Sequence, residues 1–248
     1  MSGHSKWSSI KRKKGTADVR RSKIFSKIVK EIQIAVKENG TDPESNPRLR
    51  LAIQNAKGAN MPKDNILRAI NKASSEGASY QEVSFEGYGP GGIAVFIECL
   101  TDNNNRTVST IRSVFAKKGG NLGTNGSLSF LFDRKGVFTI PKGDVDPDEF
   151  ELEIIDAGAE EIEDENDFLV ITTALDDFGN VQKKLEKLNV QAENAELQRI
   201  PNNTTELDIE TALRFLKIVE AFEDDDDVQN VYHNLEMTDE LIKILENE

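Results

Sequence analysis

The sequence has few of the residues on which disulfides, metal sites and membrane spans depend. Its 248 residues include one cysteine, two histidines and one tryptophan. The single cysteine, Cys99, cannot form an internal disulfide, and no apolar run approaches the ~18 residues of a membrane span. The residues after Met1 are basic and polar, without the apolar segment of a secretory signal. We therefore expect a cytoplasmic protein that has no membrane partner.

The same scarcity argues against catalysis. With only His4 and His233, and with Cys99 inside an apolar strand pattern, the chain offers no metal-ligand set and no Cys/His nucleophile pair. The four aspartates at 224–227 lack the spacing and the glycine of a calcium loop, and they are expected to form a solvated loop. The glycine-rich segment 87–92 lacks the ending of a phosphate loop. We predict no enzyme, no cofactor and no small-molecule substrate.

Charge is distributed very unevenly. Residues 1–79 carry a formal charge of +10 and the remainder carries −23, which together give the net charge of −13. A negative net charge is common and keeps proteins soluble, so the unusual feature is the basic segment at residues 1–79. Such asymmetry indicates an end that binds a polyanion.

The first 23 residues contain eight basic side chains and hardly any apolar ones. Their charge suits contact with phosphates, which gives affinity without sequence preference. Trp7 lies among these cations and is suited to stacking on an unpaired base; the alternative is that it docks on the neighbouring helices. The expected nucleic-acid-binding residues of this segment are Lys6, Trp7, Lys11, Arg12, Lys13, Lys14, Arg20, Arg21 and Lys23.

Three helices are expected next, at about 18–38, 47–57 and 62–73, because apolar residues recur at helical spacing and prolines open the second and third. In the first helix, Ile24, Ile28 and Ile32 form an apolar stripe. The lysines cluster on the far side, which would extend the basic surface through Lys23, Lys27 and Lys30. Helices joined by such short loops predict a small bundle.

The rest of the chain reads as mixed α and β structure. Strands are expected at 83–88, 93–100, 127–132 and 137–140, with a turn at 87–92 and a helix at 105–118. Residues 137–199 show the order βαββαβ of a ferredoxin-like unit. The C-terminal helix at 208–222 and the strand at 228–235 have no sheet of their own, so we expect them to return to the middle sheet. The predicted fold is therefore an α+β multidomain protein with a helical bundle at 1–79, a discontinuous α/β domain at 80–136 plus 200–248, and an inserted ferredoxin-like domain at 137–199.

Residues 101–106 read TDNNNR, and the asparagines are expected to cap the helix that follows. On that helix, Arg106 begins an exposed polar stripe opposite Val108 and Ile111. Arg106 is therefore a further candidate for contact with nucleic-acid phosphates or ribose hydroxyls.

Several uncommon strings resemble the YebC family along essentially the whole chain. They are GHSKW at 3–7, KIF at 23–25, NPRLR at 46–50, ANMPKDNI at 59–66, EGYGPGG at 86–92, LTDNNNRT at 100–107, GGNLG at 119–123 and VQNVYH at 228–233. The resemblance implies a helical bundle and two α/β domains, the last inserted in the second. It also implies either of two roles, since members are described as probable DNA-binding transcriptional regulators, whereas others, including the mitochondrial translational activator of cytochrome oxidase, are ascribed to the ribosome.

Two functions therefore stand open. The first is a DNA-binding regulator of transcription, and the second is a ribosome-associated factor that binds ribosomal RNA and assists elongation. The absence of a base-reading helix-turn-helix pattern and the acidic body favour the second on physical grounds. A third class, a scaffold for protein interactions whose basic charge is incidental, would bind its partners regardless of salt and nuclease.

Overall fold

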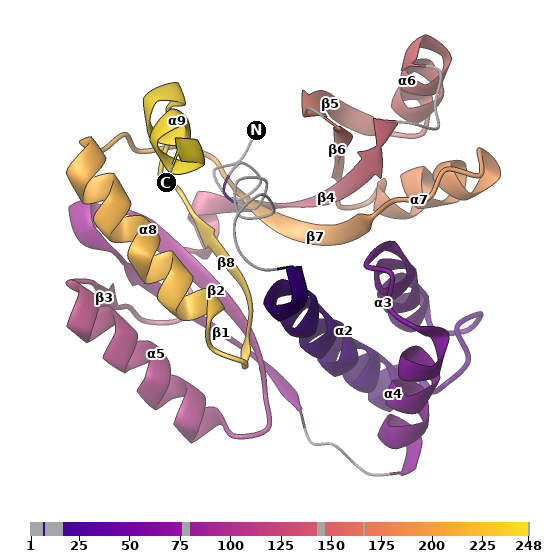
Figure 1. Ribbon diagram of the computed structural model, residues 1–248, viewed down its shortest axis with the longest axis horizontal. Helices are drawn as coiled ribbons and strands as arrows, with labels where there is room; N and C mark the ends of the chain where they lie inside the picture. The colour runs from indigo at the N-terminus through magenta and orange to yellow at the C-terminus, as the bar shows by residue number, and fades with distance from the viewer. Residues whose placement is uncertain (1–6, 8–16, 76–79, 143–146, 166, 248) are drawn as a thin grey trace. The chain divides into compact units, whose positions relative to one another are not determined.

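The computed structural model describes residues 7, 17–75, 80–142, 147–165 and 167–247, which contain eight α-helices, eight β-strands and two short 3-10 helices (Figure 1). The chain divides into two compact units, the first from residues 1–27, 78–133 and 200–248 and the second from residues 28–77 and 134–199. Each unit is built around one four-stranded sheet. The predicted α+β class is confirmed, whereas the three-domain division stays a prediction.

The three N-terminal helices lie where the sequence places them: α2 at Ala17–Asn39, α3 at Pro47–Gly58 and α4 at Lys63–Ser75. Asn46 caps α3 by accepting a hydrogen bond from the Leu49 amide at 3.0 Å. The burial of α2 differs from a simple stripe. Ile24 is 47% exposed, whereas all residues from 32 to 36 are buried, so this turn of the helix is enclosed on all sides before residues 37–39 emerge into solvent.

The sheet of the first unit has the order β3-β1-β2-β8, with β1 at Gln81–Tyr88, β2 at Ala94–Thr101, β3 at Asn121–Leu122 and β8 at Val228–His233. All three pairings are antiparallel. Because β8 pairs with β2, the C-terminal strand returns to the middle sheet as expected. The predicted turn between β1 and β2 contains the 3-10 helix η1 at Pro90–Gly92, where Gly91 and Gly92 have φ of 72° and 77°.

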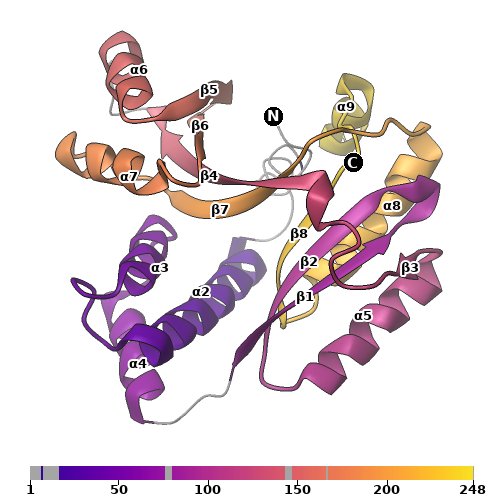
Figure 2. The ribbon, with the colours of Figure 1, turned by 180° about the vertical axis from the view of Figure 1, so that it is seen from behind.

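Helices α5 (Asn104–Lys118) and α8 (Ile209–Glu223) cover one face of this sheet, as Figures 1 and 2 show, and α9 spans Asp239–Asn247. Strand β2 is buried on both faces. Val95 and Ile97 belong to the core shared with α5 and α8, whereas Ala94 and Phe96 alternate with them and pack with Leu128, Phe132 and Tyr232. The sheet therefore separates two apolar layers.

The second unit contains β4 (Phe132–Pro141), α6 (Pro147–Asp156), β5 (Ala159–Glu165), β6 (Phe168–Ala174), α7 (Phe178–Lys187) and β7 (Asn194–Pro201). This is the βαββαβ order predicted, and the strands lie in the order β5-β6-β4-β7. Side chains of α6 and α7, among them Ile154 and Val181, pack on sheet residues such as Phe138 and Ile171.

Helix α3 is attached to the sheet of this second unit. The Asn55 side chain donates to the Ala195 carbonyl at 2.8 Å and accepts from the Ala195 amide at 2.9 Å. Gly58 lies so close to β7 that an added Cβ would be 2.0 Å from the Glu193 carbonyl oxygen. Helices α3 and α4, the part of α2 from Ile28 onward and the βαββαβ segment thus share one compact unit.

The expectation of a strand at 127–132 is wrong except for its last residue. Residues Ser129–Leu131 form the 3-10 helix η2, and β4 starts only at Phe132. The cause is a distant side chain: the buried carboxylate of Glu86 accepts hydrogen bonds from the amides of Gly126 and Leu128. These bonds hold the backbone in a loop where its apolar pattern alone predicts a strand.

Candidate nucleic-acid interface

Several of the expected contact residues cannot be placed. Lys6, Lys11, Arg12, Lys13 and Lys14 lie outside the described residues, and of Arg20 the structure describes only that it belongs to α2. Arg21 is exposed near the start of α2. The structure therefore bears on this basic segment mainly through α2 and Trp7.

Two lysines of α2 contact the segment that runs from the acidic residues after α8 into β8. Lys23 forms an ion pair with Asp224, and the Lys27 ammonium donates to the Gln229 carbonyl at 2.7 Å. The Lys23 and Asp224 side chains are 42% and 69% exposed, so water and salt screen this pair. Lys30 is half-buried. The basic face expected to be open is thus partly engaged within the first unit.

Trp7 is 3% exposed and belongs to the core of the first unit. Its indole Nε1 donates to the Glu223 carboxylate at 3.4 Å. In this arrangement the ring is not available to stack on a base, and its packing partners are the sheet and helices of the first unit rather than the three-helix bundle. Stacking by Trp7 stays a prediction that requires the ring to leave this site.

Arg106 is held by two carboxylates. Its Nη2 donates to Asp227 at 2.6 Å and to Asp102 at 2.8 Å, while 51% of its side chain remains exposed. The hydrogen bond to Asp227, followed by that to Asp102, raises the pKa of the guanidinium above its ordinary value. Asn103 caps α5 by accepting from the Arg106 amide at 3.1 Å, which confirms the capping prediction.

The carboxylate of Asp227 is the centre of a polar network. It accepts from the hydroxyls of Thr101 and Thr107 at 3.1 and 2.9 Å, and its side chain is 7% exposed. The expectation of a solvated loop is therefore wrong for Asp227, although Asp224 and Asp226 are exposed. Arg106 compensates a buried charge in addition to offering an exposed surface.

The role of the acidic run was missed by sequence reasoning. Glu223 and Asp224 contact Trp7 and Lys23 across more than 200 residues of sequence, and Asp227 holds Arg106. The available signal was a block of five carboxylates directly after a helix, in a chain whose opposite end is strongly basic. The acidic run, residues 223–227, thus contacts three of the predicted nucleic-acid-binding residues.

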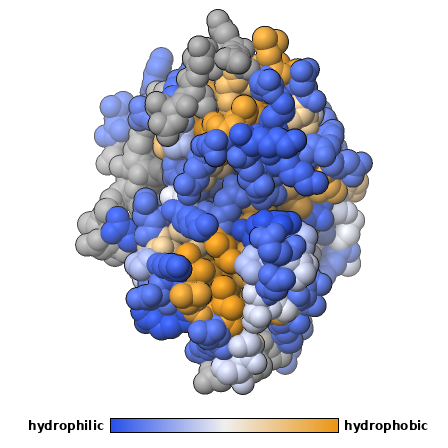
Figure 3. All heavy atoms as spheres, turned by 90° about the vertical axis from the view of Figure 1, so that its right-hand side faces the viewer, coloured by the Kyte–Doolittle hydropathy of each residue, from blue (hydrophilic) through white to orange (hydrophobic). Residues whose placement is uncertain are grey.

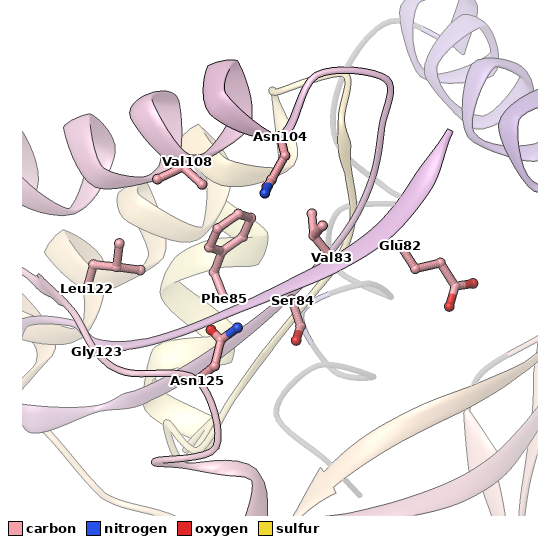
Figure 4. Close-up of a pocket in the computed structure, with 9 residues that line it drawn as sticks. All are labelled: Glu82, Val83, Ser84, Phe85, Asn104, Val108, Leu122, Gly123 and Asn125. Carbon is pink, nitrogen blue, oxygen red and sulfur yellow. The ribbon is translucent and has the colours of Figure 1, made fainter. Parts of the chain in front are cut away.

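A groove of about 460 Å³ lies beside β1 (Figure 4). Val83 and Phe85 point from the strand toward α5, which contributes Asn104 and Val108. Among the lining residues only Glu82 is ionisable, so the groove offers apolar contact and amide hydrogen bonds rather than acid–base chemistry.

The described residues contain no group of three or more His, Cys, Asp or Glu side chains placed to bind a metal ion. No described helix combines the length and apolarity needed to cross a membrane. His233 lies at the end of β8, where it is fully buried and meets the Phe215 ring edge-on at 5.2 Å between ring centres.

Comparison with known proteins gives the family. Residues 5–76 match the family described as the TACO1/YebC protein N-terminal domain, and residues 80–235 match the TACO1/YebC second and third domain. The chain belongs to the TACO1/YebC family. This confirms the resemblance drawn from the sequence motifs.

Individual relatives of this TACO1/YebC chain extend over nearly all of it. A protein of Amoebophilus asiaticus is 54% identical to this chain, and the match covers 95% of this chain and 98% of the relative. A protein of Persephonella marina is 49% identical, and the match covers 98% of this chain and 99% of the relative. Both relatives are named probable transcriptional regulatory protein. The crystal structure of a conserved hypothetical protein from Aquifex aeolicus is similar, with a TM-score of 0.81 and 44% identity over 89% of this chain and 92% of that one.

Proposed function

We propose that this protein regulates gene expression by binding nucleic acid through its basic N-terminal segment and α2. The observation that carries the proposal is the set of contacts between this end and the acidic run. Lys23 already pairs with the Asp224 carboxylate and the Lys27 ammonium already donates to the Gln229 carbonyl, so both cations are suited to bind phosphates in place of these oxygens. The role is one of binding rather than catalysis, and its compartment is the cytoplasm.

Transcriptional regulation by DNA binding is the function that the names of the relatives support. Within the proposal, the helical bundle, the discontinuous α/β domain and the inserted ferredoxin-like domain act as separate parts, with the bundle and its basic tail supplying most of the affinity.

Binding to ribosomal RNA, with a role in translation, is the alternative. The charge distribution favours this alternative, because residues 80–248 carry a formal charge of −23. Duplex DNA that wraps around the protein would be repelled by these residues. A ribosomal site would require contact only at the basic end.

The first test is a salt titration of binding to DNA and to RNA. We expect deletion of residues 1–14 to weaken affinity and to flatten the slope of log K against log salt, because each lost phosphate contact removes about 0.9 from that slope on duplex DNA. An unchanged affinity and slope would reject the basic segment as the binding element.

Crosslinking in growing cells, with both DNA and RNA sequenced after stringent washing, separates the two functions. Recovery of discrete promoter DNA with RNA at background supports the transcriptional role. Recovery of a localised ribosomal RNA segment supports the translational role, and binding that persists after nuclease treatment and high salt contradicts both.

A further inference from the structure

Phe130 is the most exposed large apolar side chain among the residues that the structure describes. Its exposed fraction is 71%, whereas Phe132, two residues later, is only 5% exposed. The sequence pattern gave no reason to single it out, since it predicts a strand there. Exposing an aromatic ring to water is unfavourable, so a ring that is held exposed in the folded protein is a candidate contact residue.

The backbone on both sides of Phe130 is fixed. Leu128, two residues earlier, is fully buried, and it packs in the same apolar layer as Phe132, two residues later. The Leu131 amide donates to the Leu128 carbonyl at 2.9 Å and closes the 3-10 turn. The exposed ring thus projects from a turn that is anchored at each end.

Two polar side chains reinforce this turn. The buried Glu86 carboxylate binds the amides of Gly126 and Leu128. On the other side, the Asn202 amide donates to the Leu131 carbonyl at 2.9 Å and its side chain donates to the Phe130 carbonyl at 3.2 Å. A ring on so restrained a backbone loses little conformational freedom when it binds, which favours affinity.

The loop that carries Phe130 is uncharged from residue 123 to residue 130, and the nearest charged positions along the chain are Asp133 and Arg134. All residues from 123 to 130 are exposed except Leu128. The exposed side chains of this segment and of the adjoining Asn202 turn are hydroxyls and amides, namely Thr124, Asn125, Ser127, Ser129, Asn202 and Asn203. Such groups hydrogen-bond the edges of unpaired bases, whereas docking of a protein partner favours a contiguous apolar patch.

We propose that Phe130 stacks on an unpaired base of single-stranded nucleic acid, with the hydroxyls and amides of residues 124–129 and 202–203 beside it to contact the base edge. This inference rests on the proposed nucleic-acid binding and adds to it a second contact, made by the first unit's loop and independent of charge. Stacking on an aromatic ring accepts any base, so the site confers a preference for single strands rather than for sequence.

The test measures the affinity of the full chain for a single-stranded RNA of mixed sequence and for the matching duplex. We expect Phe130→Ala and Phe130→Leu each to weaken single-strand binding about tenfold, because a base–aromatic stack is lost. Phe130→Trp should retain the affinity, and its added fluorescence should be quenched by the single strand. The salt slope should not change, since no charge is altered.

Leu152→Ala provides the matched control, because Leu152 on α6 is 68% exposed and also apolar. Retained affinity in Phe130→Leu would mean that a hydrophobic contact suffices, as in protein docking, and would overturn the stacking assignment. The stacking assignment would also be overturned if the unmodified chain binds single-stranded RNA and all Phe130 variants bind it equally well. If the unmodified chain binds neither DNA nor RNA, the proposed function itself fails.

Discussion

The Arg106 guanidinium lies 2.6 Å from an Asp227 carboxylate that is almost completely buried. The two residues are 121 positions apart, and their pairing joins the start of α5 to the acidic run after α8. Thr101 and Thr107 complete the carboxylate's hydrogen bonds. The pair therefore couples a residue chosen as a nucleic-acid contact to the stability of the first unit.

We predict that Arg106→Ala lowers the melting temperature, because it leaves the buried Asp227 carboxylate without its cation. Arg106→Lys should lower it less, since the charge is kept while the planar geometry is lost. Thermal unfolding followed by circular dichroism measures both. In the double variant with Asp227→Asn, the further effect of Arg106→Ala should largely disappear; an equal loss in both backgrounds would show that the pair contributes nothing.

A second prediction concerns competition between carboxylates and phosphates. Asp224→Asn removes the partner of Lys23, so affinity for nucleic acid should rise several-fold at low salt and the gain should fade as salt increases. Fluorescence anisotropy with labelled RNA or DNA measures it. Asp239→Asn, in the first turn of α9, removes the same charge elsewhere in the first unit and serves as control. Equal gains from both would indicate an effect of net charge alone.

Asn46 makes a third prediction possible. Its fully buried side chain donates to the carbonyls of Ala35 and Gly40 at 2.7 and 2.8 Å and also caps α3. Asn46→Ala removes the cap and leaves both carbonyls without this donor, which should cost about 3 kcal/mol of unfolding free energy. Urea denaturation measures the loss. Asn71→Ala on the exposed face of α4 should change stability by less than about 0.5 kcal/mol.

The pH dependence of stability gives a fourth prediction. Asp208 caps α8, and hydrogen bonds from Thr211, first from its amide and then from its hydroxyl, lower the pKa of the Asp208 carboxyl below the ordinary 3.8. A lowered pKa means that its stabilising contribution is present above pH 3.8 and is lost as the pH falls through the lower, folded value. Urea midpoints of the parent and Asp208→Ala should therefore differ at pH 7 and converge in strong acid. A difference that stays constant with pH would contradict this assignment.

Local signals predicted most of the elements. Helix α3 begins at the Asn46-Pro47 pair and α5 ends at Gly119, whose φ of 81° closes the helix. Such boundaries depend on a few neighbouring residues, so they can be read without knowing the fold. The return of β8 to the middle sheet could also be predicted, because a lone C-terminal strand must find a partner; its antiparallel pairing with β2 could not.

Long-range polar contacts could not be read in the same way. Alternation of Leu128, Phe130 and Phe132 is typical of a strand with one buried face, yet the Glu86 carboxylate turns this backbone and exposes the middle ring. Likewise, Lys23 and Asp224 are 201 positions apart, and composition alone does not pair them. These contacts determine which of the predicted cations are open to a ligand.

Strand β8 has a consequence for the order in which a nascent chain can fold. The second unit is complete once residue 199 has been synthesised, whereas the sheet of the first unit lacks its edge strand until residue 233. Strands β1 and β2 are made early, but helix α8, which packs on their sheet, and strand β8, which pairs with β2, are made only after residue 208. During synthesis, the sheet of the second unit, β5-β6-β4-β7, should therefore fold before the sheet of the first unit, β3-β1-β2-β8. A chain truncated before residue 228 lacks β8, so it should expose the edge of β2 and aggregate.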